Sequence, residues 1–102
     1  MKFKTHNDKE VNTGGTSLVG TIDINFNKLF EVFGEPTGSD GYKSDAEWEI
    51  EFEDGTVGTI YNWKDGINYN GDDGTPTEEI THWHIGGNSK EVISKIKSVL
   101  FV

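Results

Sequence analysis

The chain has 102 residues, of which 32% are hydrophobic, and includes three tryptophans, three tyrosines and six phenylalanines. It is therefore long and apolar enough for one folded domain with a modest core. Eighteen acidic residues stand against nine lysines, with no arginine, and the formal charge of −9 opposes direct binding of nucleic acid. The absence of cysteine excludes disulfides, thiolate metal sites and cysteine nucleophiles.

No apolar run approaches the roughly 18 residues of a membrane span. The first ten residues, MKFKTHNDKE, lack the apolar core of a signal peptide. We therefore expect a cytoplasmic protein that does not bind membranes.

The N-terminal third is predicted to contain an arm, a strand and a helix. Residues 1–17 are polar and glycine-rich, which predicts a flexible arm with room for a short edge strand. Residues 18–102 form the single domain, and LVGTIDI at 18–24 has the β-branched content of a strand. Asn25 can cap a short helix that ends at Gly34. Its apolar stripe consists of Phe26, Leu29, Phe30 and Phe33.

A β-hairpin is predicted for residues 46–63, AEWEIEFEDGTVGTIYNW. Asp54-Gly55 is typical of a two-residue turn between alternating strands. That turn sets apolar residues opposite one another in the pairs Phe52–Val57, Ile50–Thr59, Trp48–Tyr61 and Ala46–Trp63. A bulged turn would instead place Gly58, Ile60 and Asn62 on the core face, a less apolar set, so the two-residue turn is favoured.

The C-terminal part begins with a long connection, residues 64–79, of a length that is often functional. Residues 80–85 resume the strand pattern, and Gly86-Gly87 leads into a final helix capped by Asn88 or Ser89. The order strand, helix, three strands, helix predicts an α+β domain. We expect a mostly antiparallel sheet with two helices packed on one face.

A first candidate site is the strand-to-helix junction HIGGNSKE, His84 to Glu91. Backbone amides at two glycines, together with the helix dipole, can hold a phosphate or carboxylate. The alternative is an ordinary glycine turn with a good helix cap.

Flat rings form a second candidate. Alternation predicts Trp48, Tyr61 and Trp63 in the core, whereas Tyr69 and Trp83 are better placed for contact with a ligand. Combined with the junction, the loop from Trp63 to Tyr69 would complete a small nucleotide pocket. The predicted ligand-binding residues are Trp63, Lys64, Tyr69, Trp83, His84, Gly86, Gly87, Asn88, Ser89 and Lys90.

Two further patterns leave alternatives open. The first strand of the hairpin carries Glu47, Glu49, Glu51 and Glu53, which form either a solvated face or a negative stripe for a basic partner, as in a nucleic-acid mimic. His82 and His84 point to one face and could share a metal with a third ligand that the sequence does not specify. Ordinary surface histidines are the alternative, and no motif of nucleophilic or phosphoryl-transfer catalysis is present.

The segments LVGTI, LFEVFGEPT, AEWEIEFEDGTVGTIYNWK and WHIGG together resemble a group of small uncharacterised bacteriophage-encoded proteins. The resemblance runs from about Ser17 to the last helix and implies a phage setting rather than an activity. Small acidic phage proteins without catalytic motifs often resemble counter-defence factors.

We therefore expect a non-enzymatic binding protein of the host cytoplasm, without a cofactor, that sequesters a small phosphorylated nucleotide signal, with a homo-oligomer as one expected assembly. The first alternative is an acidic nucleic-acid mimic that binds a basic host protein. The second is a small metal-assisted enzyme that uses His82 and His84.

Overall fold

The computed structural model describes residues 2–38 and 44–101, and within these ranges the chain forms one five-stranded antiparallel sheet with three α-helices. The sheet order is β1-β3-β4-β5-β2. The strands are β1 (Phe3–Thr5), β2 (Ser17–Asp23), β3 (Glu47–Phe52), β4 (Val57–Tyr61) and β5 (His82–Gly87). The helices are α1 (Phe26–Phe33), α2 (Ile67–Asn70) and α3 (Glu91–Leu100), with 3-10 turns at Gly71–Asp73 and Thr77–Glu79. The predicted α+β fold is confirmed.

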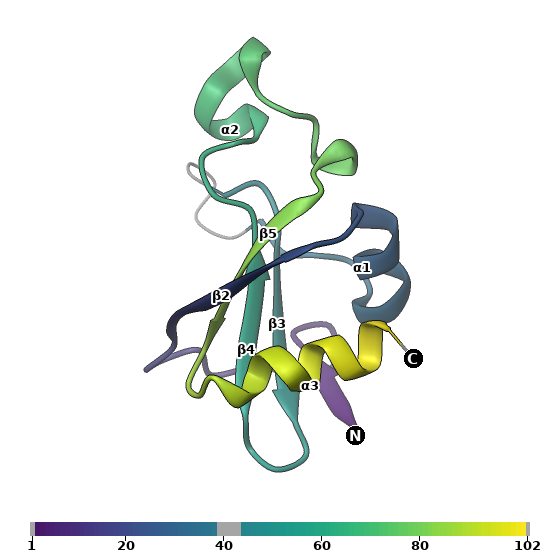
Figure 1. Cartoon of the computed structure of the whole chain (residues 1–102), viewed down its shortest axis with the longest axis vertical. Helices are drawn as coiled ribbons and strands as arrows, with labels where there is room; N and C mark the ends of the chain where they lie inside the picture. The colour runs from purple at the N-terminus through teal and green to yellow at the C-terminus, as the bar shows by residue number, and fades with distance from the viewer. Residues whose placement is uncertain (1, 39–43, 102) are drawn as a thin grey trace.

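Helices α1 and α3 cover one face of the sheet and enclose the core (Figure 1). Two buried tryptophans, Trp48 of β3 and Trp83 of β5, meet edge to face at its centre, with ring centroids 5.3 Å apart. Apolar side chains from both helices pack around them: Leu29 and Phe33 from α1, and Val92, Ile96 and Leu100 from α3. The apolar stripes of the helices and the alternation of the strands thus share one interior.

The hairpin between β3 and β4 has the bulged turn, so the predicted two-residue turn is wrong. Gly55, with φ of +89°, donates its N–H to Phe52 O, and Ile50 pairs with Gly58 rather than with Thr59. A type I turn followed by a left-handed glycine is a common three-residue hairpin loop. The change of one residue moves Tyr61 and Trp63 off the core face.

The core accepts Gly58 because helix α3 needs the space. A Cβ at Gly58 would lie 2.5 Å from Cγ2 of Val92 and 3.3 Å from Cδ1 of Ile96. A larger side chain there would push the helix away from the sheet. Gly58, which the sequence suggested would be a poor core residue, is therefore a point of close approach between α3 and the sheet.

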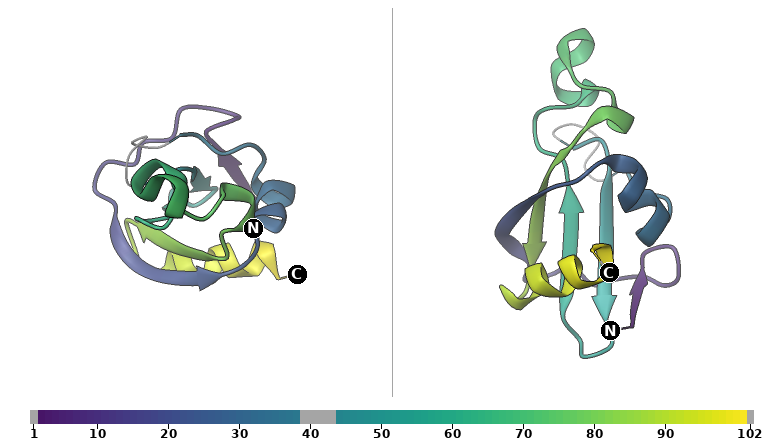
Figure 2. Two further views of the ribbon diagram at one scale, coloured as in Figure 1. Left: turned by 90° about the horizontal axis from the view of Figure 1, so that it is seen from above. Right: turned by 45° about the vertical axis from the view of Figure 1, so that its right-hand side comes forward.

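Much of the expected N-terminal arm belongs to the folded domain. Strand β1 pairs with β3, and both Thr5 and Val11 are buried. The chain between β1 and β2 then crosses the face of the sheet opposite α3, as the view from above shows (Figure 2). This crossing leaves the outer face open around Tyr61, whereas Val57 and Thr59 on the same face are buried. The predicted boundary at residue 18 is therefore not a boundary of the fold.

The long connection, residues 64–79, stands at one end of the molecule (Figure 1). It is folded into α2 and the two 3-10 turns, and Gly66 bridges to Thr75 at its base. The fully buried side chain of Asn62 anchors this base. Its Oδ1 accepts from the backbone N–H groups of Asp45 and Ala46, and its Nδ2 donates to the carboxylates of Asp45 and Asp65. None of the helices in the described ranges has the length and apolar character needed to cross a bilayer.

Candidate binding surface

The double-glycine junction is closed by the sheet. Gly86 and Gly87 are buried residues of β5 and pair with β4 on one side and β2 on the other. A Cβ at Gly86 would meet Oγ1 of Thr59 at 2.6 Å, and one at Gly87 would meet Cγ1 of Val92 at 2.6 Å. The expected cradle of free glycine amides is therefore wrong: these glycines allow close packing.

The start of α3 lies apart from the aromatic residues of the predicted pocket. The N–H of Asn88 donates to Val57 O and its Oδ1 accepts from Val57 N, while Ser89 Oγ accepts from the N–H of Glu91. Lys90 is exposed beside them. Asn88, Ser89 and Lys90 follow the end of β5 remote from α2, so the structure does not bring them to Trp63 and Tyr69 (Figure 1). The single nucleotide pocket expected from the sequence is divided between two ends of the sheet.

Trp83 is a core residue and not a contact residue. Its side chain is 0% exposed, and its Nε1 donates to Ile24 O at 3.0 Å. Strand alternation explains this placement, because Trp83 and Ile85 point inward and His84 points outward.

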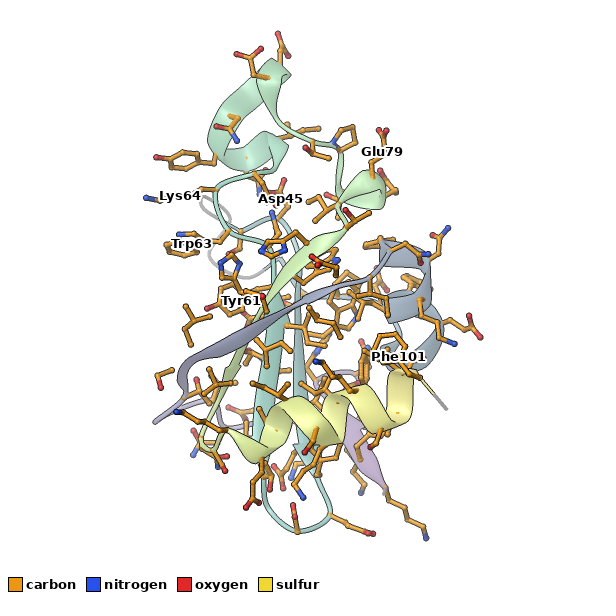
Figure 3. The ribbon with its side chains drawn as sticks, viewed as in Figure 1. Asp45, Tyr61, Trp63, Lys64, Glu79 and Phe101 are labelled. Atoms are coloured by element: carbon orange, nitrogen blue, oxygen red, sulfur yellow. The ribbon has the colours of Figure 1, made fainter. Side chains whose placement is uncertain are left out.

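A connected group of side chains remains at the outer face near α2, and we call it the aromatic surface. It consists of Leu18, Tyr61, Trp63, Lys64, Tyr69 and His84. Four of these line a cavity of about 310 Å³: Leu18, Tyr61, Trp63 and His84. Figure 3 shows Tyr61, Trp63 and Lys64 following one another along the same side of the molecule.

The rings of this surface hold one another in place. Tyr61 meets Trp63 edge to face at 6.3 Å and stacks on His84 at 5.7 Å with an interplanar angle of 21°. Lys64 Nζ lies 5.7 Å from the ring centre of Trp63 and 5.5 Å from that of Tyr69. Trp63 remains 40% exposed and Tyr69 38% exposed. Large rings that are fixed by neighbours and still open to solvent are well suited to binding, because little side-chain entropy is lost on contact.

Lys64 has an unusual backbone conformation that helps to form the surface. Its φ of +59° lies in the left-handed region, which is uncommon for a residue other than glycine. Its carbonyl oxygen accepts from Asn70 Nδ2 at 2.8 Å, so α2 fixes the turn that presents Lys64 to both rings. No local sequence pattern predicts this conformation of Lys64. The hydrogen bond that fixes it comes from the side chain of Asn70, six residues further along the chain.

The floor of the cavity carries no charge at neutral pH. Burial lowers the pKa of His84, helped by His82 and opposed by Asp65, so the imidazole is neutral. Within the described part of the chain its buried Nδ1 has no hydrogen-bond partner. Burial, with a contribution from Glu47, raises the pKa of Tyr61 and keeps the phenol protonated. Lys64 is thus the positively charged residue of the aromatic surface. Two carboxylates lie near its other members: Glu47 acts on Tyr61, and Asp65 acts on His84.

A row of carboxylates adjoins the aromatic surface. Glu47, Glu49 and Glu51 alternate with buried residues of β3 and share the outer face, and we call them the glutamate row. Glu47 lies directly opposite Tyr61 across the β3–β4 pair. Glu51 is partly neutralised by Lys9, whose Nζ lies 3.2 Å from Oε1. The fourth predicted residue, Glu53, is exposed beyond the strand, in the turn.

His82 and His84 are neighbours, with ring centroids 5.6 Å apart. His82 Nδ1 lies 2.7 Å from Oδ1 of Asp23. Across residues 2–38 and 44–101, no group of three histidine, aspartate or glutamate side chains is close enough to hold a metal ion. The third ligand that the metal hypothesis requires is therefore not supplied by these residues.

A larger hollow of about 590 Å³ lies beside β1, and its lining includes Glu51 and Glu53, two of the four glutamates predicted as partner-binding. It is lined by Lys2, Phe3, Lys4, Lys9, Glu51, Phe52 and Glu53. Because its lysines face glutamates and one pair already forms an ion pair, we interpret it as a charged edge that discourages strand pairing.

The fold and its surfaces define an α+β domain that presents exposed rings beside a row of carboxylates. Neither a comparison with protein-family models nor one with curated proteins finds a match for the chain.

Proposed function

We propose that this protein acts without catalysis, by binding the basic surface of another protein through the aromatic surface and the glutamate row. The observation that most supports this proposal is the cross-strand pair of Glu47 and Tyr61, which makes the rings and the carboxylates one continuous surface. Rings supply buried contact area and carboxylates supply attraction for lysine and arginine. Glu47 and Tyr61 lie on the adjacent strands β3 and β4, and Trp63 and Tyr69 follow in the connection after β4.

The charges favour a cationic partner over a phosphate. The aromatic surface has one lysine, the electrostatic environment of its one histidine, His84, includes Asp65, and Glu47 lies opposite Tyr61. A phosphate would meet these carboxylates on a chain of formal charge −9. An arginine side chain would instead stack on Trp63 or Tyr69 and pair with Glu47, which combines cation–π and charge-assisted contacts.

In the phage setting that the sequence resemblance implies, the partner is a host defence protein or nucleic-acid-binding protein. The glutamate row then takes the place of nucleic-acid phosphates on the partner's basic surface. Such an inhibitor acts stoichiometrically in the host cytoplasm.

Nucleotide capture remains a second candidate because of one observation. Lys64 Nζ lies within 6 Å of two exposed rings, at 5.7 Å from Trp63 and 5.5 Å from Tyr69. A base could stack on either ring while Lys64 contacts a phosphate. This version of the pocket uses none of the glycine amides.

A titration with a short arginine-rich peptide tests the main proposal. The affinity of a Glu47→Gln/Glu49→Gln variant is compared with that of a Glu78→Gln/Glu79→Gln control, which removes the same charge. Glu79 lies on the other side of the α2 end from Trp63 (Figure 3). We expect the first variant to bind at least about tenfold more weakly and to lose much of the salt dependence. Equal weakening in the control would show that the peptide responds to net charge alone, and would refute the proposed surface.

Native mass spectrometry with a panel of cyclic nucleotides tests the second candidate. Capture would give a bound mass with wild-type protein that disappears in Trp63→Ala and Lys64→Ala. A spectrum without a bound nucleotide, in protein that binds the peptide, would eliminate nucleotide capture.

A further inference from the structure

The two edges of the sheet differ in how well they are protected against pairing with another strand. Edge strands expose unpaired N–H and C=O groups, and proteins protect them with short length, lysine, proline or bulges. β1 has three residues and carries Lys4. β2 has seven residues, SLVGTID, and its only charged residue is Asp23 at its end.

Within residues 2–38 and 44–101, β2 pairs with β5 alone, and no other strand lies along its outer side. Figure 2 shows β2 at the rim of the molecule with no ribbon beyond it. Leu18 is 59% exposed, and Ser17 and Thr21 are exposed as well. Besides Asp23 at its end, the irregularity between Leu18 and Gly20 is the protective feature of this edge.

The composition of β2 also decides which partner suits it. Two copies of a chain with formal charge −9 repel each other, so they can meet only where the surface is locally neutral. β2 meets this condition along its first six residues, which are uncharged, and its one carboxylate, Asp23, stands at the end of the strand. An antiparallel pair related by a two-fold axis near Gly20 would also keep the two Asp23 carboxylates at opposite ends.

We propose that the outer edge of β2 pairs antiparallel with β2 of a second copy of this chain, which joins two sheets into one of ten strands. Antiparallel self-pairing satisfies the unpaired backbone groups of both edges at once. The inference does not depend on the proposed function, because β2 pairing uses backbone groups and does not involve Trp63, Tyr69 or the glutamate row; Leu18 is the one residue that belongs to both β2 and the aromatic surface.

Analytical ultracentrifugation over a range of protein and salt concentrations tests this pairing, with Thr21→Lys compared against Ser98→Lys. Both positions are exposed and both changes add one positive charge, but Ser98 lies on α3. We expect wild type and Ser98→Lys to form dimers that tighten as salt rises, since repulsion between the acidic copies is screened. Thr21→Lys places two lysines near each other across the axis and should raise the dimer dissociation constant at least about tenfold.

Hydrogen exchange on the wild-type protein gives a second readout that needs no substitution. About half of the β2 amides face outward, and these should gain protection as protein concentration rises, while amides of β1 should not. Wild type that stays monomeric at high concentration and salt would overturn the proposal. A dimer abolished by Trp63→Ala and unaffected by Thr21→Lys would also overturn it, because that dimer would use the aromatic surface.

Discussion

Replacing Asn62 by alanine should destabilise the domain by about 3 kcal/mol, although Asn62 lies outside the aliphatic core. The side chain is fully buried and makes four hydrogen bonds. Its loss leaves the N–H groups of Asp45 and Ala46 without an acceptor, at about 1–1.5 kcal/mol each, and adds a small cavity. For a domain of this size that corresponds to a melting temperature lower by roughly 15 °C.

Urea unfolding measures this loss, and Asn68→Ala is the matched control. Asn68 is exposed, and the hydrogen bond from its Nδ2 to Ser44 O is long at 3.4 Å, so its truncation should cost under about 0.5 kcal/mol. The m-value should stay constant, which would show that the compactness of both states is unchanged. A loss below about 1 kcal/mol for Asn62→Ala would refute the view that this amide anchors the α2 end.

Three other predictions concern packing, charge and the two kinds of tryptophan. Gly87→Ala should lower the free energy of unfolding in urea by about 1–3 kcal/mol, because the new Cβ meets Val92 of α3. Binding of the arginine-rich peptide should be retained. Normal stability with lost binding would restore the glycines as a ligand site. A hydrogen bond from Lys95, assisted by Thr56, lowers the pKa of Asp54 below its ordinary value of 3.8. The Asp54 carboxylate therefore contributes to stability above about pH 4, and this contribution is lost as the pH falls. Asp54→Asn should flatten the acid side of a plot of urea midpoint against pH. An unchanged plot would contradict this ion pair. Trp83→Ala should lower the free energy of unfolding by about 3–5 kcal/mol, because Trp83 is buried. Trp63→Ala should lower it by under about 1 kcal/mol and weaken peptide binding. Thermal melts that show similar losses for both variants would contradict this difference in burial.

The sequence predicted the fold well because the strongest patterns were local. The strict alternation of β3, the stripe of α1 and the stripe of α3 each need only their own residues, and all three elements form. The register of the β3–β4 hairpin was wrong because a long-range effect decides it. Gly58 faces the core to admit α3, and Asn62 faces it because Asp45 and Asp65 complete its hydrogen bonds. Helix α3 is far along the chain from Gly58 and Asp45 is 17 residues from Asn62, whereas Asp65 is only three residues from Asn62.

The sequence predicted only part of the candidate site, because some of its residues lie in local patterns and others are placed by long-range contacts. Trp63, Lys64, Tyr69 and His84 do come together, and the long connection that was expected to be functional supplies two of them. Gly86 and Gly87 were misassigned because a double glycine before a helix has two physical uses, an open amide cradle or close packing. Only the positions of β2, β4 and α3 distinguish these uses. Leu18 was missed because its exposure depends on the irregular pairing of β2.

The emission of Trp63 is the most direct test of the proposed binding surface, because Trp48 and Trp83 are fully buried and Trp63 is the tryptophan that solvent reaches. The protein is titrated with the arginine-rich peptide and, separately, with cyclic nucleotides, at low and high salt. We predict that the peptide changes the emission at low salt, that high salt reverses the change, and that nucleotides leave it unaltered. An emission that responds to a nucleotide and ignores the peptide would contradict the proposal that this protein binds a basic protein surface.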